Sequence, residues 1–165
     1  MNRKTLILSD KQIQHKIRRI AFQILEFYNG KTDLIIAGIA DNGYIFAERL
    51  VKDISVISDH RPKLCKIQID KKNPQLKPDV SLKVSEYSKQ TVVLVDDVLN
   101  TGTTLIYTVK HLLEANLKEL KTAVLIDRSH KRFPIKADFK GLSLSTSLNE
   151  TVNVSFDDEA KAVLS

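Results

Sequence analysis

Apolar residues recur along this chain at two spacings, one typical of helices and the other typical of strands. Residues 9–30 begin with a Ser-Asp capping signal, end at Gly30 and carry apolar residues at every third or fourth position. Helices are also expected over residues 43–54 and 103–117, where the same spacing returns. The buried face of the first helix is predicted to consist of Ile13, Ile17, Ile20, Ile24 and Phe27.

Shorter apolar runs alternate with these helices. Residues 33–40, 91–97 and 122–127 are predominantly apolar, which is typical of buried strands in a parallel sheet. Apolar and polar residues alternate over residues 63–69, and this period of two predicts another strand.

The remaining segments are more polar. Residues 70–90 contain two prolines and many lysines, so we expect a long loop or an irregular hairpin there. Residues 137–145 and 151–156 are typical of edge strands. Strands alternating with helices predict an α/β fold with a mostly parallel central sheet flanked by helices. Residues 1–165, with 42% hydrophobic content, are expected to form a single domain.

The composition argues against contact with a membrane. The longest uncharged apolar stretch, residues 34–40, is much shorter than the about 20 residues of a membrane span. The apolar patch near the N-terminus is too short for a signal peptide. The single cysteine, Cys65, has no partner for an internal disulfide and is expected to be a buried strand residue. We therefore expect a cytoplasmic protein.

The net charge of +6 is unevenly distributed. A surplus of basic residues attracts polyanions, either a nucleic acid or a phosphorylated substrate. A solvated loop is the simpler interpretation here, because lysine predominates. The segment 61–89 holds eight basic residues (Arg61, Lys63, Lys66, Lys71, Lys72, Lys77, Lys83 and Lys89) against three acidic residues (Asp70, Asp79 and Glu86).

The segment Val92–Thr104, with the sequence VVLVDDVLNTGTT, combines a buried strand with two kinds of polar chemistry. Asp96 and Asp97 end the apolar run, and we expect them to be surface acids in the loop after the strand. A hydroxyl-rich turn, Thr101–Thr104, follows and opens a predicted helix. Backbone N–H groups at the start of a helix, together with threonine hydroxyls, are suited to binding a phosphate.

Two carboxylates repel a phosphate and therefore need hydroxyl groups or a cation as partners. The chain has neither a Walker A motif nor a G-x-G dinucleotide fingerprint. A phosphorylated sugar satisfies both features, because its hydroxyls donate to the acids while the turn holds its phosphate. Residues 40–43 follow another predicted strand, and in parallel sheets such junctions meet at the ligand-binding edge.

The acidic strand end followed by Thr-Gly-x-Thr resembles the phosphoribosyl diphosphate (PRPP) signature of the type I phosphoribosyltransferase family. The resemblance implies that Asp96 and Asp97 are the catalytic acids and contact the ribose hydroxyls. It also implies magnesium bound mainly through PRPP and water, with no metal site built by the protein. The implied ribose and 5′-phosphate site consists of Asp96, Asp97, Thr101, Gly102, Thr103 and Thr104. The implied pyrophosphate loop, which in the family often contains a non-proline cis peptide, consists of Ala40, Asp41, Asn42 and Gly43.

Residues 1–26, 92–104 and 123–147 are similar to the PyrR branch of this family, uracil phosphoribosyltransferases that regulate pyrimidine operons by binding RNA. The similarity implies PRPP and a pyrimidine base or nucleotide as ligands, with uracil converted to UMP. It further implies a small hood built from terminal segments and a homo-oligomer, a dimer or a larger assembly. The residues implied to contact the base are Lys140, Gly141 and Leu142, and those implied to contact RNA are Arg18, Arg19, His130, Lys131 and Lys136.

The chain departs from the PyrR branch at three places. Residues 41–43, Asp-Asn-Gly, replace Thr-Arg-Gly, which removes a cation beside the diphosphate. Residues 70–73, Asp-Lys-Lys-Asn, stand where relatives carry a Tyr-Arg pair in a flexible loop. Phe22 replaces a histidine and Arg18 a threonine on the helix that contacts RNA.

Three functions remain open: an active phosphoribosyltransferase, a nucleotide-sensing RNA-binding regulator with residual catalysis, and a catalytically weak ligand-binding member. Asn100 stands where several purine-specific enzymes carry aspartate, which disfavours a purine. The four histidines show no paired spacing and therefore argue against a protein metal site. His130 follows Asp127-Arg128 and is a candidate for substrate contact.

Overall fold

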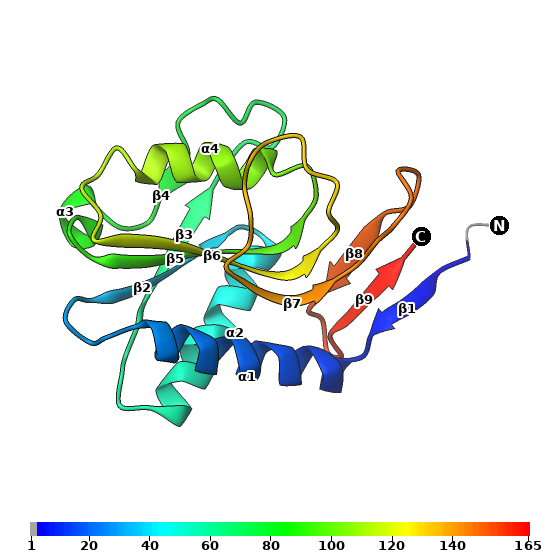
Figure 1. Ribbon diagram of the computed structural model, residues 1–165, viewed down its shortest axis with the longest axis horizontal. Helices are drawn as coiled ribbons and strands as arrows, with labels where there is room; N and C mark the ends of the chain where they lie inside the picture. The colour runs from blue at the N-terminus through cyan, green and yellow to red at the C-terminus, as the bar shows by residue number, and fades with distance from the viewer. Residues whose placement is uncertain (1–2) are drawn as a thin grey trace.

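A six-stranded sheet forms the centre of the structure, which is a computed structural model describing residues 3–165 (Figure 1). The strand order is β4 (Asp79–Val80), β3 (Lys63–Gln68), β2 (Leu34–Ile39), β5 (Thr91–Leu99), β6 (Glu119–Asp127) and β7 (Phe139–Ser143). All neighbouring strands pair in parallel except β4, which pairs antiparallel with β3. The carboxyl ends of the five parallel strands therefore lie along one edge of the sheet.

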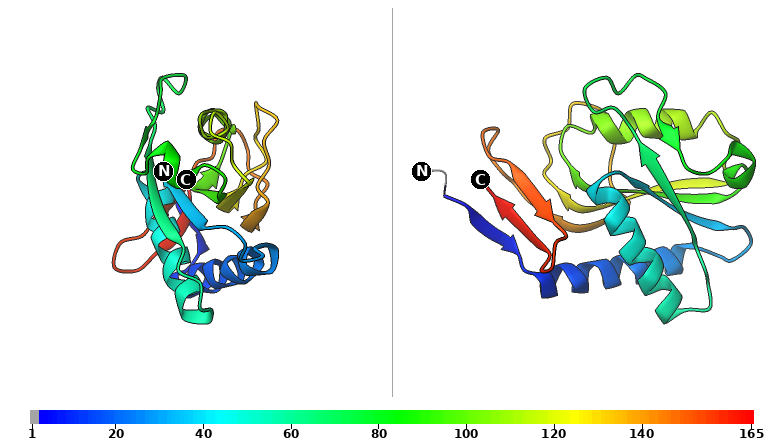
Figure 2. Two further views of the ribbon diagram at one scale, coloured as in Figure 1. Left: turned by 90° about the vertical axis from the view of Figure 1, so that its left-hand side faces the viewer. Right: turned by 180° about the vertical axis from the view of Figure 1, so that it is seen from behind.

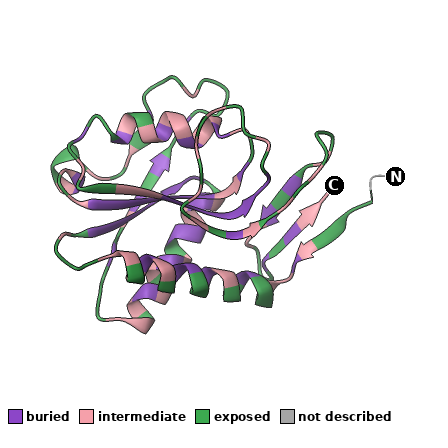
Figure 3. Ribbon diagram, in the orientation of Figure 1, coloured by how far each residue is buried: buried purple, intermediate pink, exposed green. Residues whose placement is uncertain are grey.

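Helices cover both faces of this sheet. Figure 1 shows α1 (Asp10–Phe27) and α2 (Asn42–Ile57) on one face and α4 (Thr103–Leu112) on the other. Adjacent residues of β2 serve different cores, because Ile36 packs with α1 and α2 whereas Ile35 packs with α4. Figure 3 shows the buried residues of the central strands between these layers. The predicted α/β fold is confirmed.

The first helix forms as its sequence predicts. A capping box closes its N-terminus: Ser9 N donates to Gln12 Oε1 at 2.9 Å, and Gln12 N donates to Ser9 Oγ at 3.4 Å. Phe27, at the last turn, is only half-buried. The four predicted isoleucines are fully or almost fully buried: Ile13, Ile17, Ile20 and Ile24.

A second sheet lies beside the carboxyl edge of the first (Figures 1 and 2). It has three antiparallel strands in the order β1 (Thr5–Leu8), β9 (Lys161–Leu164) and β8 (Val152–Ser155). The two ends of the chain therefore build the hood together. The sequence predicts β8 but not β1 or β9, because their pairing partners lie at opposite ends of the chain.

Other differences from the predicted elements lie at element boundaries. Residues 70–90 form an irregular hairpin through β4, as expected, but also contain a short helix, α3 (Val84–Tyr87). α4 ends at Leu112, before the predicted residue 117, and turns lead into β6. β6 begins earlier than predicted, at Glu119, because that residue pairs with Thr91 of β5.

Two further expectations concern buried and apolar segments. Cys65 is 2% exposed within β3, as predicted, and burial raises the pKa of its thiol. None of the helices within residues 3–165 has the length and apolarity needed to cross a membrane.

Candidate active site

A cavity of about 370 Å³ lies at the carboxyl edge of the central sheet. It is lined by Lys71, residues 96–105 and residues 151–153, so its walls come from β5, α4 and the hood. A larger cavity of about 620 Å³ lies between residues 77–84 and α4, but neither the acidic pair nor the predicted phosphate turn lines it. The smaller cavity is therefore the one that combines both predicted chemistries.

Asp96 is a buried residue of β5 and is 4% exposed. Its Oδ1 accepts a hydrogen bond from Asp97 N at 2.9 Å. Burial first, and then the charge of Asp97, raise the pKa of Asp96 well above its usual value, while the charge of Lys71 opposes the shift. The expectation of a surface acid is wrong for Asp96, because β5 continues through the acidic pair to Leu99. Its environment favours the protonated carboxyl, which donates as well as accepts hydrogen bonds.

Asp97 is half-buried, and two neighbouring groups donate hydrogen bonds to its carboxylate. Val98 N donates to Asp97 Oδ1 at 2.8 Å, and Asn42 Nδ2 donates to Asp97 Oδ2 at 3.2 Å. The same Asn42 amide donates to the carbonyl oxygen of Val154 in β8 at 2.8 Å. Asn42 therefore connects one acid of the pair to the hood.

The turn Thr101–Thr104 opens α4, as predicted. Gly102 has a φ of +83°, a left-handed conformation that favours glycine. A Cβ on Gly102 would lie 2.4 Å from Ile135 Cγ2, so the segment after β6 packs directly against the turn. The hydroxyls of Thr101 and Thr103 are 2.8 Å apart at this helix N-terminus. Thr103 N already donates to Thr101 Oγ1 at 3.3 Å, and the N–H groups that follow it in the first helical turn, with the hydroxyls beside them, suit an anion.

The loop Ala40–Gly43 lies against the acidic pair. Its first peptide bond, between residues 40 and 41, is cis. A Cβ on Gly43 would lie 2.8 Å from Val95 O and 3.0 Å from Asp96 Oδ1, so only glycine permits this close approach. Two strand–helix junctions that are far apart in the sequence therefore meet at one site.

Comparison with known proteins shows the family of the chain. The phosphoribosyl transferase domain family matches residues 6–161 of the chain. The chain belongs to the phosphoribosyltransferase family. Two similar curated proteins are the bifunctional protein PyrR of Clostridium acetobutylicum, 35% identical over 173 residues, and that of Staphylococcus aureus, 34% identical over 169 residues. The first alignment covers 99% of this chain and 97% of the relative, and the second covers 96% and 97%.

Solved structures of phosphoribosyltransferases share the fold. The hypoxanthine phosphoribosyltransferase of Trypanosoma cruzi superposes with a TM-score of 0.78 at 18% identity, over 97% of this chain and 95% of the other. A hypoxanthine-guanine phosphoribosyltransferase of Bacillus anthracis gives 0.72 at 21% identity, over 85% and 82% of the two chains.

The residues expected to contact the base do not line the cavity of about 370 Å³. Lys140, Gly141 and Leu142 lie in the edge strand β7. Arg19 of α1 donates from Nη1 to Lys140 O at 3.2 Å and from Nη2 to Gly141 O at 2.7 Å. The hood segment 151–153 lines the cavity, and no pattern in the sequence indicated that it would. Lys71 was also missed, although it belongs to the basic surplus noted above.

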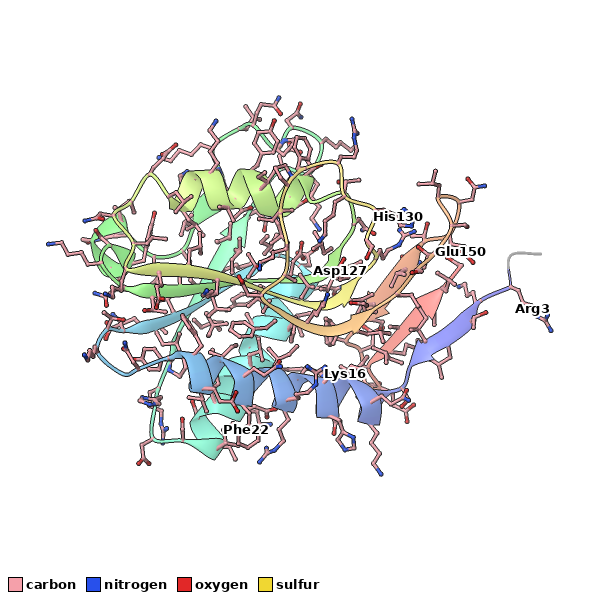
Figure 4. All side chains as sticks on the ribbon, in the orientation of Figure 1. Arg3, Lys16, Phe22, Asp127, His130 and Glu150 are labelled. Atoms are coloured by element: carbon pink, nitrogen blue, oxygen red, sulfur yellow. The ribbon has the colours of Figure 1, made fainter. Side chains whose placement is uncertain are left out.

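The residues expected to contact RNA are partly occupied by other groups. Arg19 binds carbonyl oxygens of β7, Lys131 lies 3.7 Å from Asp127, and the His130 ring contacts Thr146 O at 2.7 Å. Figure 4 places His130 near the hood and Phe22 on the outer side of α1. The remaining two, Arg18 and Lys136, are exposed.

The described part of the chain, residues 3–165, contains no group of three or more His, Cys, Asp or Glu side chains placed to hold a metal. The side chains that line the cavity include the carboxylates of Asp96 and Asp97 and several threonine hydroxyls. Such hard donors fit magnesium that arrives with a phosphorylated substrate.

Proposed function

We propose that the protein transfers the phosphoribosyl group of PRPP to uracil, forming UMP and releasing pyrophosphate. The observation that carries this proposal is a single cavity containing both the acidic pair and the phosphate turn. The C1–O bond to pyrophosphate breaks, a bond from C1 to the base nitrogen N1 forms, and the N1 proton is lost.

Each part of the cavity has one role in this proposal. The N–H groups and hydroxyls of Thr101–Thr104 bind the 5′-phosphate. Asp96 and Asp97 hold the ribose hydroxyls, and the charge of Asp97 stabilises the positive charge that develops on the ribose during transfer. Asn42 keeps the Asp97 carboxylate in place through its hydrogen bond of 3.2 Å.

The diphosphate lies on the side of Lys71 and the loop Ala40–Gly43. Magnesium bound with PRPP neutralises the leaving diphosphate. This chain lacks the arginine that PyrR relatives carry in the loop, and Lys71 supplies a positive charge at the cavity instead. The base then lies between Asn100 and the hood segment 151–153, which form the wall that remains.

RNA binding is a second candidate function. It is favoured by the similarity to the bifunctional PyrR proteins and by the net charge of +6. Arg18 and Lys136 provide exposed positive charge, whereas Arg19 and Lys131 already have partners. Phe22 offers no hydrogen-bond donor for base recognition. We therefore propose weak RNA binding that collapses between about 50 and 200 mM salt.

One assay separates these functions: PRPP consumption with magnesium and a panel of free bases, with RNA binding measured in parallel. UMP formation from uracil supports the transferase. Tight, sequence-selective RNA binding at physiological salt without transfer would identify a regulator, and PRPP binding without either activity would identify a weak ligand-binding member. Sedimentation analysis tests the predicted homo-oligomer.

A further inference from the structure

Arg128 is a buried cation that follows β6 and connects the hood to the cavity. It is 8% exposed, and only neutral oxygen atoms accept its hydrogen bonds. Nη1 donates to Asn100 Oδ1 at 2.9 Å. The other acceptors are Thr146 Oγ1 (3.1 Å from Nε and 2.9 Å from Nη2), Ser147 O (3.3 Å from Nη2) and Glu150 O.

The contact between Arg128 and Asn100 fixes the orientation of the Asn100 side-chain amide. A guanidinium carries N–H donors and no acceptor, so the atom facing Arg128 has to be the amide oxygen. The amide nitrogen then lies on the other branch of the side chain. No hydrogen bond within residues 3–165 engages that nitrogen, and Asn100 lines the cavity. The cavity therefore receives a donor at this position.

Asn100 borders the part of the cavity that is left for the base. The turn Thr101–Thr104 takes the phosphate and the acidic pair takes the ribose, so Asn100 and the hood segment 151–153 border the third part. Of that segment, Asn153 directs its amide elsewhere, because its Nδ2 donates to Ser165 Oγ at 3.3 Å. Asn100 is thus the side-chain amide available to a base.

We propose that Arg128 is a positioning residue that makes Asn100 present its amide N–H to a ring carbonyl oxygen of the base. This inference rests on the proposed function and adds that the protein donates, rather than accepts, the hydrogen bond to the base. A base that offers an acceptor at that point is bound, and a base that offers an N–H donor is rejected. Sites built around one hydrogen bond discriminate strongly, because the wrong partner leaves a polar group unpaired.

Arg128 also anchors residues 146–150 of the hood, so replacing it by alanine would mix anchoring with recognition. The Asn100→Asp substitution avoids the difficulty. One carboxylate oxygen still accepts from Arg128, whereas the other now presents an acceptor to the base.

The experiment measures Kd for UMP and for ribose 5-phosphate by calorimetry, because the ratio isolates the contribution of the base. Asn100→Asp is expected to weaken UMP binding about 10- to 100-fold relative to ribose 5-phosphate, and Asn100→Ala about 3- to 10-fold. Asn116→Asp adds the same charge at an exposed position outside the cavity and is the control. It is expected to leave both affinities unchanged.

Arg128→Lys keeps the charge but loses the planar fork, and it is expected to lower the UMP to ribose 5-phosphate affinity ratio. A purely anchoring role would lower both affinities together and leave that ratio unchanged. The inference is overturned if the ratio stays at the wild-type value in both Asn100 variants. If the wild-type protein binds neither ligand, the proposed phosphoribosyl site itself fails, which is a different result.

Discussion

Replacing Asp96 by asparagine should stabilise the protein while impairing its activity. Asp96 Oδ1 accepts a hydrogen bond of 2.9 Å from Asp97 N, and the side-chain oxygen of asparagine can accept the same bond. It also places N–H donors where the protonated carboxyl has its proton. The substitution removes a group whose ionisation is opposed by burial and by the charge of Asp97.

The size of the effect follows from the burial of this side chain. Asp96 is 4% exposed, and burying an ionisable carboxyl beside a second acid costs stability that a neutral amide does not cost, on the order of 1–3 kcal/mol. Removing that cost in a chain of 165 residues corresponds to a rise of about 2–4 °C in Tm for each kcal/mol. Transfer should nevertheless fall about tenfold, because the amide nitrogen cannot accept a hydrogen bond from a ribose hydroxyl as a carboxyl oxygen does.

The stabilisation should also depend on pH. The pKa of Asp96 is higher in the folded protein than in the unfolded chain, so the folded state binds the proton more tightly. Wild-type stability therefore falls as pH rises above the unfolded pKa, and the asparagine variant loses this dependence. Thermal unfolding of both proteins from pH 4 to pH 8 should show an advantage of the variant that grows with pH. A less stable variant with unchanged transfer would give Asp96 a structural role and refute this reasoning.

Three further substitutions test other parts of the site. Gly102→Ala places a side chain at a φ of +83° and against Ile135. We expect the unfolding free energy to fall by at least about 1 kcal/mol, measured by denaturation, and ribose 5-phosphate to bind more weakly, measured by calorimetry. Asn42→Asp replaces a donor to Asp97 by a carboxylate, and kcat should fall more than the KM for PRPP rises; equal stability and kinetics would exclude a positioning role. Lys71→Ala should raise the KM for PRPP and leave Tm within about 1 °C, whereas an unchanged KM would remove Lys71 from the diphosphate site.

The central sheet could be predicted from the sequence because its buried strands are marked by local patterns of apolar residues. Buried strands such as residues 91–97 are marked by continuous apolar runs, and α1 is marked by its apolar spacing and its cap. The location of the phosphate turn also followed from one contiguous motif, Val92–Thr104. Gly102 is the N-cap residue of α4, where the motif predicted the turn.

Features that depend on contacts between distant segments could not be predicted from the sequence. Nothing local in residues 151–153 indicates that they line the cavity, since their position depends on the pairing of β8 with β9 at the end of the chain. The hydrogen bond from Asn42 to Asp97 joins residues on two separate junctions. The burial of Asp96 depends on Gly43, which approaches it from the other junction. The predicted base contacts 140–142 rest on resemblance alone, and in the structure the carbonyl oxygens of Lys140 and Gly141 accept hydrogen bonds from Arg19.

A crystal structure of the protein with UMP tests the central claim most directly. We predict that the phosphate lies in the turn Thr101–Thr104 within hydrogen-bonding distance of its backbone N–H groups, with the ribose hydroxyls against Asp97. The uracil ring should then lie between Asn100 and the hood segment 151–153. UMP bound outside this cavity, or an empty cavity at saturating UMP, would contradict the assignment of a phosphoribosyl-binding site.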